Sequence, residues 1–278
     1  MKKILTIQDI SCVGKCSVTA ALPIISALGI ETCIVPTALL STHTQFDGFT
    51  FRDLSDEMSK ILEHWKTQNF HFDAIYTGYL GSESLINLAM EFISAFKEEN
   101  TKIIVDPAMA DAGQLYAGLP AGLEAKMKML CGCADIILPN ISEACLMLDE
   151  PYPGEDASKE EIEALLNKLS TLGAKSSVIT GVDFGDGTLG FAGRAEDGSF
   201  FSYGAEKINM SSHGTGDVFA ATFTGSLVRG ASEFEALKIA TDFTSACIKN
   251  SYNDPDHVSY AVNFEAEIPY LLKRAGII

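Results

Sequence analysis

Short apolar runs that alternate with stretches of helix length are the feature of this sequence that most constrains its fold. Each run has the length and composition of a buried strand, and polar residues, glycine or proline follow it. This order predicts an α/β fold with a mostly parallel central sheet and helices on both faces. The expected strands are Ile4 to Ile7, Glu31 to Val35, Ala74 to Thr77, Ile103 to Val105, Ile136 to Leu138 and Val178 to Thr180.

The pattern changes after residue 180. Leu189 to Ala192 and Phe200 to Tyr203 alternate in polarity around a turn at Asp197-Gly198, which predicts antiparallel hairpin strands at one edge of the sheet. Gly185 to Gly190 matches a dinucleotide-binding GxGxxG motif, but that motif requires a helix where these strands follow. We therefore expect no dinucleotide fingerprint.

Two helices, Glu233 to Lys249 and Phe264 to Arg274, are expected to close the chain. The 278 residues are 47% hydrophobic and contain no low-complexity tract or linker. A chain of this size can bury one full core, so we expect a single domain over residues 1–278.

The charge balance limits the class of partner. A net charge of −17 argues against nucleic acid or an anionic membrane, because both require a basic surface. The seven cysteines are odd in number and scattered, as in a reduced cytoplasmic protein, and Cys131-Gly132-Cys133 lacks the partners of a zinc site. The apolar run after Lys3 is too short for a signal peptide. We therefore expect a cytoplasmic location.

The segment Ile208 to Gly230 carries the clearest chemical signal. Gly214, Thr215, Gly216 and Asp217 lead directly into an apolar helix. The first amides of a helix lack intrahelical partners and bear partial positive charge, so this turn predicts an anion site. A carboxylate there can accept a proton from a hydroxyl group that attacks a bound phosphate. The structural alternative is that Thr215 caps the helix and Asp217 complements its dipole.

Polar residues also follow the expected strands. Asp9, Asp106 and Asn140 should line one edge of a parallel sheet, near the Gly214 helix start, in one cleft. An acidic protein must neutralise a phosphate locally, so a phosphate site here implies Mg²⁺. Asn140 to Glu143 has the spacing of a capping box, which makes a structural role for Glu143 a serious alternative.

The segment Leu40 to Phe51 is polar, aromatic and rich in turn residues. It has no clear period, so we expect a loop or flap over a site. His43 within it has no carboxylate or cysteine placed with it, which favours an exposed loop residue over a catalyst.

Five motifs, in order along most of the chain, resemble those of the pyridoxal kinases, which belong to the ribokinase-like small-molecule kinases. The motifs are Ser41 to Gln45, Thr77 to Ser82, Asp106 to Met109, Pro139 to Glu143 and Gly214 to Asp217.

This resemblance implies transfer of the ATP γ-phosphoryl group to the 5′-hydroxymethyl of a B6 vitamer: pyridoxal, pyridoxamine or pyridoxine. It also implies Mg²⁺, a possible monovalent cation such as K⁺, and a homodimer. By position, Asp217 would be the catalytic base, and Gly214 to Gly216 would supply the anion hole. The remaining roles by position are Asp106 and Glu143 at the Mg²⁺ and phosphates, Asn140 and Thr180 near the nucleotide, and Ser11, Thr44, Gln45 and Tyr79 at the vitamer.

Two departures from the family pattern stand out. Asp9 takes the place of a serine that contacts the ring, and we hypothesise that its carboxylate favours an amine or a protonated ring nitrogen, hence pyridoxamine. Thr180 or Gly181 falls where some relatives have a nucleotide-contacting lysine. Two other functions remain open: a hydroxymethylpyrimidine kinase of the same fold, and a vitamin- or nucleotide-binding sensor without catalysis. Cysteine in place of Asp217 in many hydroxymethylpyrimidine kinases counts against the first.

Overall fold

The computed structural model describes residues 1–154, 156–210, 212–258 and 260–278. Ser211, within the expected Ile208 to Gly230 segment, lies outside the described residues. The chain forms two compact units, one of Met1–Ile75 with Ile208–Ile278 and one of Tyr76–Lys207.

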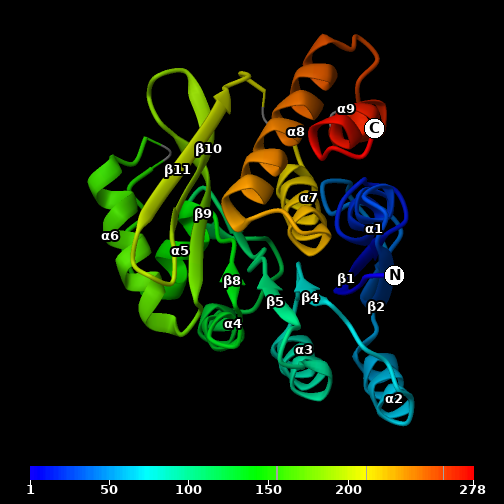
Figure 1. The fold of residues 1–278 in the computed structure, drawn as a ribbon. Helices are drawn as coiled ribbons and strands as arrows, with labels where there is room; N and C mark the ends of the chain where they lie inside the picture. Colours follow the sequence, from blue (N-terminus) through cyan, green and yellow to red (C-terminus); the bar gives the residue numbers. More distant parts are fainter. Residues whose placement is uncertain (155, 211, 259) are drawn as a thin grey trace. The chain divides into compact units, whose positions relative to one another are not determined.

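The first unit is built on a parallel strand pair. Strand β1 (Lys3–Ser11) pairs in parallel with β2 (Glu31–Leu40), and β3 (Phe51–Asp53) adds an antiparallel strand to β2. Helices α1 (Val18–Ala27) and α2 (Ser55–Lys66) lie on opposite faces of these strands (Figure 1). The strands form a buried layer between helices: side chains on both faces of β1 are buried, the polar Gln8 as well as the apolar Ile4 and Ile7.

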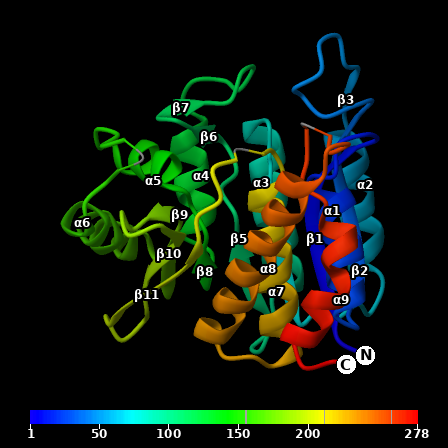
Figure 2. The ribbon, with the colours of Figure 1, turned by 90° about the horizontal axis from the view of Figure 1, so that it is seen from above.

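Three further helices complete this unit: α7 (Thr215–Arg229), α8 (Glu233–Asn253) and α9 (Phe264–Arg274). α7 packs against α1 and α8, and α9 packs against α8. Within this unit, both termini lie at one end, and the loop between β2 and β3 lies at the opposite end (Figure 2).

The second unit continues the α/β pattern. Strand β4 (Ala74–Thr77) leads into it, and β5 (Lys102–Val105), β8 (Ile136–Ile137) and β9 (Ser176–Asp183) are parallel neighbours. β10 and β11 follow as antiparallel strands. The bounds of the other elements here are β10 (Thr188–Arg194), β11 (Phe200–Glu206), α3 (Glu83–Phe96), α4 (Leu123–Cys131), α5 (Ile141–Leu148), α6 (Lys159–Leu169), the 3₁₀ helix η1 (Ser170–Leu172) and the short hairpin β6 (Ala110–Asp111) with β7 (Gln114–Leu115).

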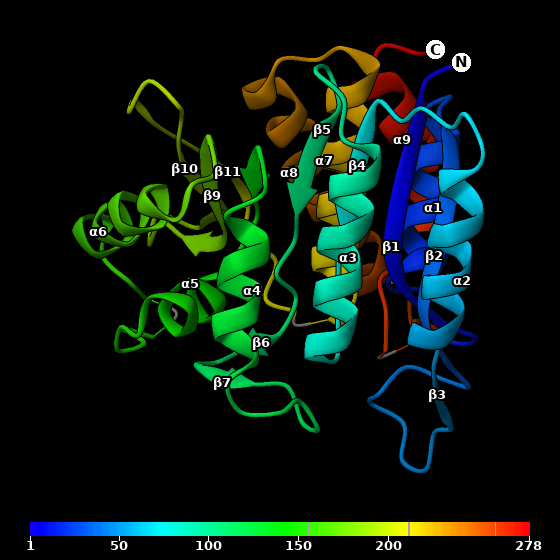
Figure 3. The same ribbon diagram turned by 90° about the horizontal axis from the view of Figure 1, so that it is seen from below.

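The expected fold class is confirmed. Parallel strands, helices on both faces of β1 and β2, and an antiparallel hairpin of β10 and β11 at one sheet edge are all present. Figure 3 shows α3 and α4 side by side in the second unit, where they also contact each other. None of the helices in the described part of the chain combines the length and apolar character needed to cross a bilayer.

Several element bounds differ from the sequence-based expectations. β1 extends to Ser11, so Asp9 lies within the strand rather than beyond it. β2 extends to Leu40 although it contains Pro36, and β3 is a strand that the sequence did not predict. α4 begins at Leu123, because Gly122 at its N-cap has φ 91°. A left-handed residue of this kind cannot continue a helix, so it delays the helix start.

Serine side chains cap the helices α3, α6 and α8. Ser82 caps α3, and Ser158 with Glu161 forms a full capping box at α6. At α8, Ser232 accepts the Glu235 amide, but the Glu235 carboxylate binds Arg274. The capping box that the spacing of Ser232 and Glu235 allows at α8 is therefore only half formed, because a guanidinium partner offers the carboxylate a charge-assisted bond.

Candidate active site

The start of α7 is the turn for which the sequence predicted an anion site. α7 begins at Thr215, with Gly214 as its N-cap at φ 78° and no side chain capping the first amides. A Cβ atom on Gly214 would lie 2.8 Å from the Lys15 carbonyl oxygen, whereas a Cβ on Gly216 would meet no atom within 4 Å. Gly214 is thus required by the turn itself, and Gly216 leaves open space above the helix start.

Thr215 does not cap α7. Its hydroxyl group donates a 3.3 Å hydrogen bond to the Ser212 carbonyl, outside the helix. The alternative in which Thr215 acts as the N-cap is therefore wrong, because the left-handed Gly214 occupies that position. Helix starts with a glycine cap leave their first amides available to a ligand.

Asp217 lies in the first turn of α7 and is half-buried. Desolvation by the surrounding protein raises the pKa of its carboxyl group to about 7, and the charge of Asp9 adds to this increase. A hydrogen bond from the Ser17 backbone amide acts in the opposite direction and favours the ionised form. The result is an acid that changes protonation state near neutral pH.

Asp9 lies close by, within β1, and its side chain is only 4% exposed. One carboxylate oxygen accepts a 2.5 Å bond from the Ser17 hydroxyl, and the other accepts a 3.3 Å bond from the Ser11 hydroxyl. Burial raises the pKa of this carboxyl group above its usual range, although both hydroxyl bonds favour ionisation. The first unit therefore brings Asp9, Ser11 and Asp217 into one polar cluster.

The loop between β2 and β3 carries Thr44 and Gln45, and both are exposed. His43 anchors the start of this loop: its Nδ1 accepts a 3.1 Å bond from the Gln45 amide, and its ring lies 4.9 Å from that of His213. Burial and the neighbouring His213 lower the pKa of His43. The segment is therefore tied to the approach to the Gly214 turn, and its role as a flap stays a prediction.

The second unit brings together the residues predicted for the nucleotide. Asp106 is buried at the end of β5, where its amide donates to the Thr77 carbonyl. Asn140 follows β8, Thr180 lies within β9, and the two residues form a parallel β-bridge with each other. Asp106 and Asn140 thus lie at the ends of neighbouring strands, as expected for an α/β sheet. Tyr79, after β4, is partly exposed.

Glu143 forms the capping box that the sequence offered as its structural alternative. One of its oxygens accepts a 2.8 Å bond from the Asn140 amide, and the other accepts the amides of Met109 at 3.0 Å and Ala110 at 3.5 Å. Burial of Glu143 raises its pKa to about 7. The carboxylate thus holds the segment after β5 against the start of α5, and its contact with Mg²⁺ stays a prediction.

No group of three or more His, Cys, Asp or Glu side chains in the described ranges is arranged to hold a metal ion. Mg²⁺ in phosphoryl-transfer sites is usually held by only one or two carboxylates, together with substrate phosphates and water. Asp106 fits such a site as a single carboxylate. Glu143 fits less well, because both of its oxygens already accept backbone amides.

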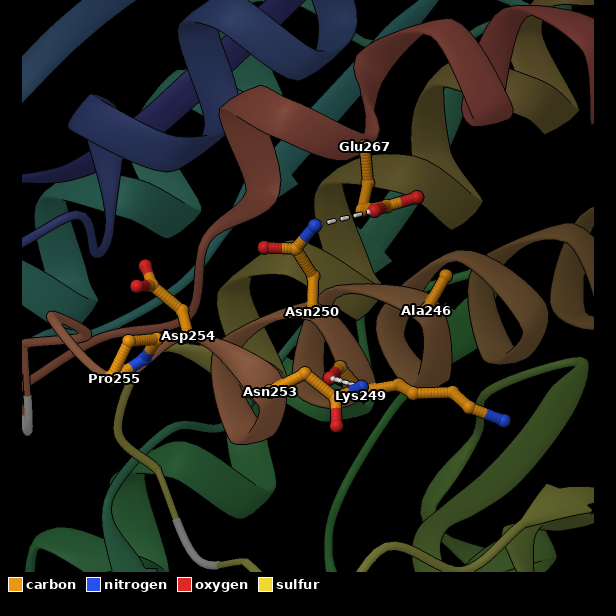
Figure 4. A pocket seen from close by; sticks show the side chains of 7 residues that line it. All are labelled: Ala246, Lys249, Asn250, Asn253, Asp254, Pro255 and Glu267. Atoms are coloured by element: carbon orange, nitrogen blue, oxygen red, sulfur yellow. Dashed lines mark hydrogen bonds between the residues drawn. The ribbon is translucent and has the colours of Figure 1, made fainter.

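An open hollow of about 550 Å³ lies in the first unit between the C-terminal half of α8, the turn after it and α9 (Figure 4). Asn250 on α8 donates a 2.8 Å bond to Glu267 on α9 across its floor. None of the residues predicted for the site lines this hollow.

Ser17 is the residue of the cluster that the sequence reasoning missed. Its backbone amide donates a hydrogen bond to Asp217, and its hydroxyl group donates one to Asp9. Ser17 is the N-cap of α1. A serine directly before an apolar helix is a recognisable cap signal, and it was the only available indication.

Comparisons with known proteins identify the family of the chain. The family model described as phosphomethylpyrimidine kinase matches residues 12–261. A pyridoxine kinase from Bacillus subtilis is 32% identical over 195 residues, which cover 67% of each chain. A bifunctional thiamine biosynthetic enzyme from Arabidopsis thaliana is 24% identical over 255 residues, and the match spans 47% of that longer protein and 90% of this chain.

Two solved structures share the fold over nearly the whole chain. A Bacteroides thetaiotaomicron protein assigned to the phosphomethylpyrimidine kinases, in a crystal form with pyridoxal, is 36% identical with a TM-score of 0.91 and covers 97% of this chain and 95% of its own. Pyridoxal kinase from Lactobacillus plantarum is 31% identical with a TM-score of 0.89, covering 98% and 97%. The resemblance to the pyridoxal kinases is thereby confirmed, and the chain belongs to the phosphomethylpyrimidine kinase family.

Proposed function

We propose that this protein is an ATP-dependent kinase that phosphorylates the 5′-hydroxymethyl group of a B6 vitamer. The observation that carries the proposal is Asp217 at the start of α7, with a pKa of about 7 beside open helix amides. A base whose pKa lies near the working pH combines a useful ionised fraction with affinity for a proton.

In the proposed reaction, Asp217 accepts the proton of the vitamer hydroxyl as its oxygen attacks the γ-phosphorus of ATP. The bond from the γ-phosphorus to the β,γ-bridging oxygen breaks, and ADP leaves with that oxygen. The amides of Gly214 to Gly216 receive the charge of the transferring phosphoryl group, and they are already fixed by the helix. The products are ADP and the 5′-phosphate.

The nucleotide side of the proposal rests on the second unit. Asp106 would hold Mg²⁺, which neutralises phosphate charge when bound. Asn140, after β8, and Thr180, within β9, would contact the nucleotide from neighbouring strands. Glu143 would act indirectly, by fixing the backbone of Met109 near Asp106. A homodimer and a cytoplasmic location remain part of the same proposal.

The vitamer side rests on the first unit and on Tyr79. Thr44 and Gln45, on the exposed loop, would cover the pyridine ring, and Ser11 would contact it from β1. Support for a B6 vitamer comes from the pyridoxal present with the Bacteroides relative and from the kinase activity named for the Lactobacillus one.

A second function, phosphorylation of hydroxymethylpyrimidine, is favoured by the description of the matching family model. ADP release by the purified protein, with Mg²⁺, ATP and each candidate alcohol in turn, separates the alternatives. We expect turnover with at least one of pyridoxal, pyridoxamine and pyridoxine to exceed that with hydroxymethylpyrimidine. Turnover with hydroxymethylpyrimidine alone would establish the second function, and none with any alcohol would indicate a sensor.

The hypothesis that Asp9 sets the vitamer preference has its own test. Asp9→Ser restores the residue expected from the pyridoxal kinases, and the hypothesis predicts a fall in the ratio of kcat/KM for pyridoxamine to that for pyridoxal. An unchanged ratio would remove the hypothesis. An unchanged ratio would have a physical reason, because both carboxylate oxygens of Asp9 already accept hydroxyl bonds and are less available to a vitamer.

A further inference from the structure

Asp9 is a buried carboxylate whose hydrogen bonds lead toward Asp217. The Ser17 and Ser11 hydroxyls bind its two oxygens, and none of the described ion pairs includes it. The register of β1 and β2 shifts between Gln8 and Ile10, at the position of Asp9. Such irregularities often re-aim a side chain near a functional site. A buried charge without a cation is costly, so its retention calls for a functional reason.

Ser17 connects the two carboxylates through a single residue. Its backbone has φ 47° and ψ −129°, a conformation that residues with a Cβ atom rarely adopt, and the residue is 5% exposed. Its side chain makes no cap bond with α1, and its hydroxyl donates to Asp9. Its amide donates to Asp217. The hydroxyl bond thus holds the strained backbone in the orientation that presents the amide to Asp217.

We propose that Asp9 is a positioning residue for the base: it holds Ser17 so that the Ser17 amide fixes the Asp217 carboxylate, and its negative charge keeps that carboxylate ready to accept a proton. This inference rests on the proposed function of Asp217. It gives Asp9 a role in proton transfer rather than in recognition of the vitamer ring. It also explains why the carboxylate is buried and bonded to hydroxyl groups.

The surrounding charges are consistent with this role. Asp9 raises the pKa of Asp217 through its charge, in addition to the larger effect of burial. The Cys16 thiol, also close, has a strongly raised pKa because of burial and both carboxylates, and so stays neutral. Lys15 pairs with Glu265, and the exposed His213 contacts His43. In α1, which packs against α7, the first turn carries no acidic residue.

The test follows the Ser17 amide and the activity in parallel. In the free wild-type enzyme, the ¹⁵N–¹H shift of Ser17 should titrate with a midpoint near the Asp217 pKa of about 7, and Asp217→Asn should abolish that transition. Asp9→Asn keeps an acceptor for Ser17 but removes the charge. We expect the midpoint, and the acidic limb of kcat/KM for ADP release, to move to lower pH by about one unit.

Glu265→Gln is the matched control, because it removes one negative charge from the same unit at a side chain that is 54% exposed and paired with Lys15. We expect no movement of the midpoint in this variant. If neither the titration midpoint of Ser17 nor the acidic limb of kcat/KM moves in Asp9→Asn, the positioning role is wrong. Normal turnover in Asp217→Asn would instead overturn the proposed function, so the two failures are distinguishable.

Ser17→Ala provides a second variant should Asp9→Asn fail to fold. It keeps the backbone amide but removes the hydroxyl bond to Asp9. Loss of a bond that positions the base should lower kcat by about three- to tenfold, with KM for the vitamer within about twofold. A rise in KM without loss of kcat would contradict the proposal, because it would place Asp9 and Ser17 in substrate binding.

Discussion

Helices α5 and α7 begin alike in sequence but differ in what their first turns do. Each carries an acidic residue at its third position, Glu143 in α5 and Asp217 in α7, and burial raises the pKa of both to about 7. Glu143 accepts three backbone amides, one of them from its own N-cap residue. Asp217 accepts the amide of Ser17, which belongs to another element.

The N-cap residues account for much of this difference. Asn140 accepts the Glu143 amide and donates to the Ala110 carbonyl, so it closes the start of α5 with side-chain bonds. Gly214 has no side chain, and the first amides of α7 remain without a side-chain cap. A carboxylate with several amide donors acts as a structural tie, whereas one beside open amides can exchange a proton with a ligand. An acidic residue at the third helix position therefore acquires its role from the cap that precedes it.

The largest expected effect is on catalysis and is specific to α7. Asp217→Asn keeps the shape of the side chain but removes its ability to accept a proton. We expect kcat to fall by about 10² to 10⁴ while KM for ATP changes little. Steady-state kinetics of ADP release measures both quantities. Near-normal turnover in this variant would exclude the base assignment and make the two helix starts equivalent.

The two glycines of α7 should separate folding from phosphate binding. Gly214→Ala puts a Cβ atom 2.8 Å from the Lys15 carbonyl oxygen at φ 78°, so we expect a loss of about 1 to 3 kcal/mol in unfolding free energy. Gly216→Ala meets no atom within 4 Å and should unfold like the wild type. If Gly216 leaves room for the phosphoryl group, kcat/KM should still fall in that variant. Unchanged kcat/KM in Gly216→Ala would place the phosphate elsewhere.

The two carboxylates should respond differently to pH. The pKa of Asp217 rises from its ordinary acidic value to about 7 on folding, so the folded state binds the proton more tightly and loses stability as pH rises through that interval. Asparagine does not ionise, so Asp217→Asn should remove this pH-dependent loss of stability. Urea unfolding should show the variant to be about 1 to 2 kcal/mol more stable than the wild type at pH 8, with little difference at pH 4.

Glu143→Gln is the counterpart in α5. Burial also penalises the ionised form of Glu143, but a glutamine amide replaces one of the two oxygens that accept backbone amides. The glutamine NH₂ group would then face a backbone N–H with no acceptor between them, which is costly. We therefore expect a lower free energy of unfolding at both pH 4 and pH 8. A gain of stability at pH 8 in this variant would show that desolvation outweighs its bonds, and the contrast between the helices would then be lost.

The parts of the molecule governed by local patterns were the parts that the sequence predicted. The apolar period located β4 and α9 to the residue, and the Asn140 spacing identified the capping box. The burial of Asp9 and the link through Ser17 could not be predicted, because they depend on a register shift between β1 and β2 and on a left-handed serine. Both features arise from tertiary contacts that cover many residues, and no short motif encodes them.

The smallest expected effect concerns the cap of α5. Asn140→Ala removes the bonds to the Glu143 amide and the Ala110 carbonyl, and should cost about 1 kcal/mol of unfolding free energy. Asn140→Ser keeps a cap acceptor but cannot reach as far as the amide group. If Asn140 also contacts the nucleotide, KM for ATP should rise in both variants, whereas a purely structural cap predicts a near-normal KM in Asn140→Ser. Ser158→Ala, at the capping box of α6, controls for the loss of a cap outside the predicted site. If KM for ATP changes in parallel with the free energy of unfolding across all three variants, Asn140 acts only as a helix cap. Asp106 and Thr180 would then remain as the proposed nucleotide contacts.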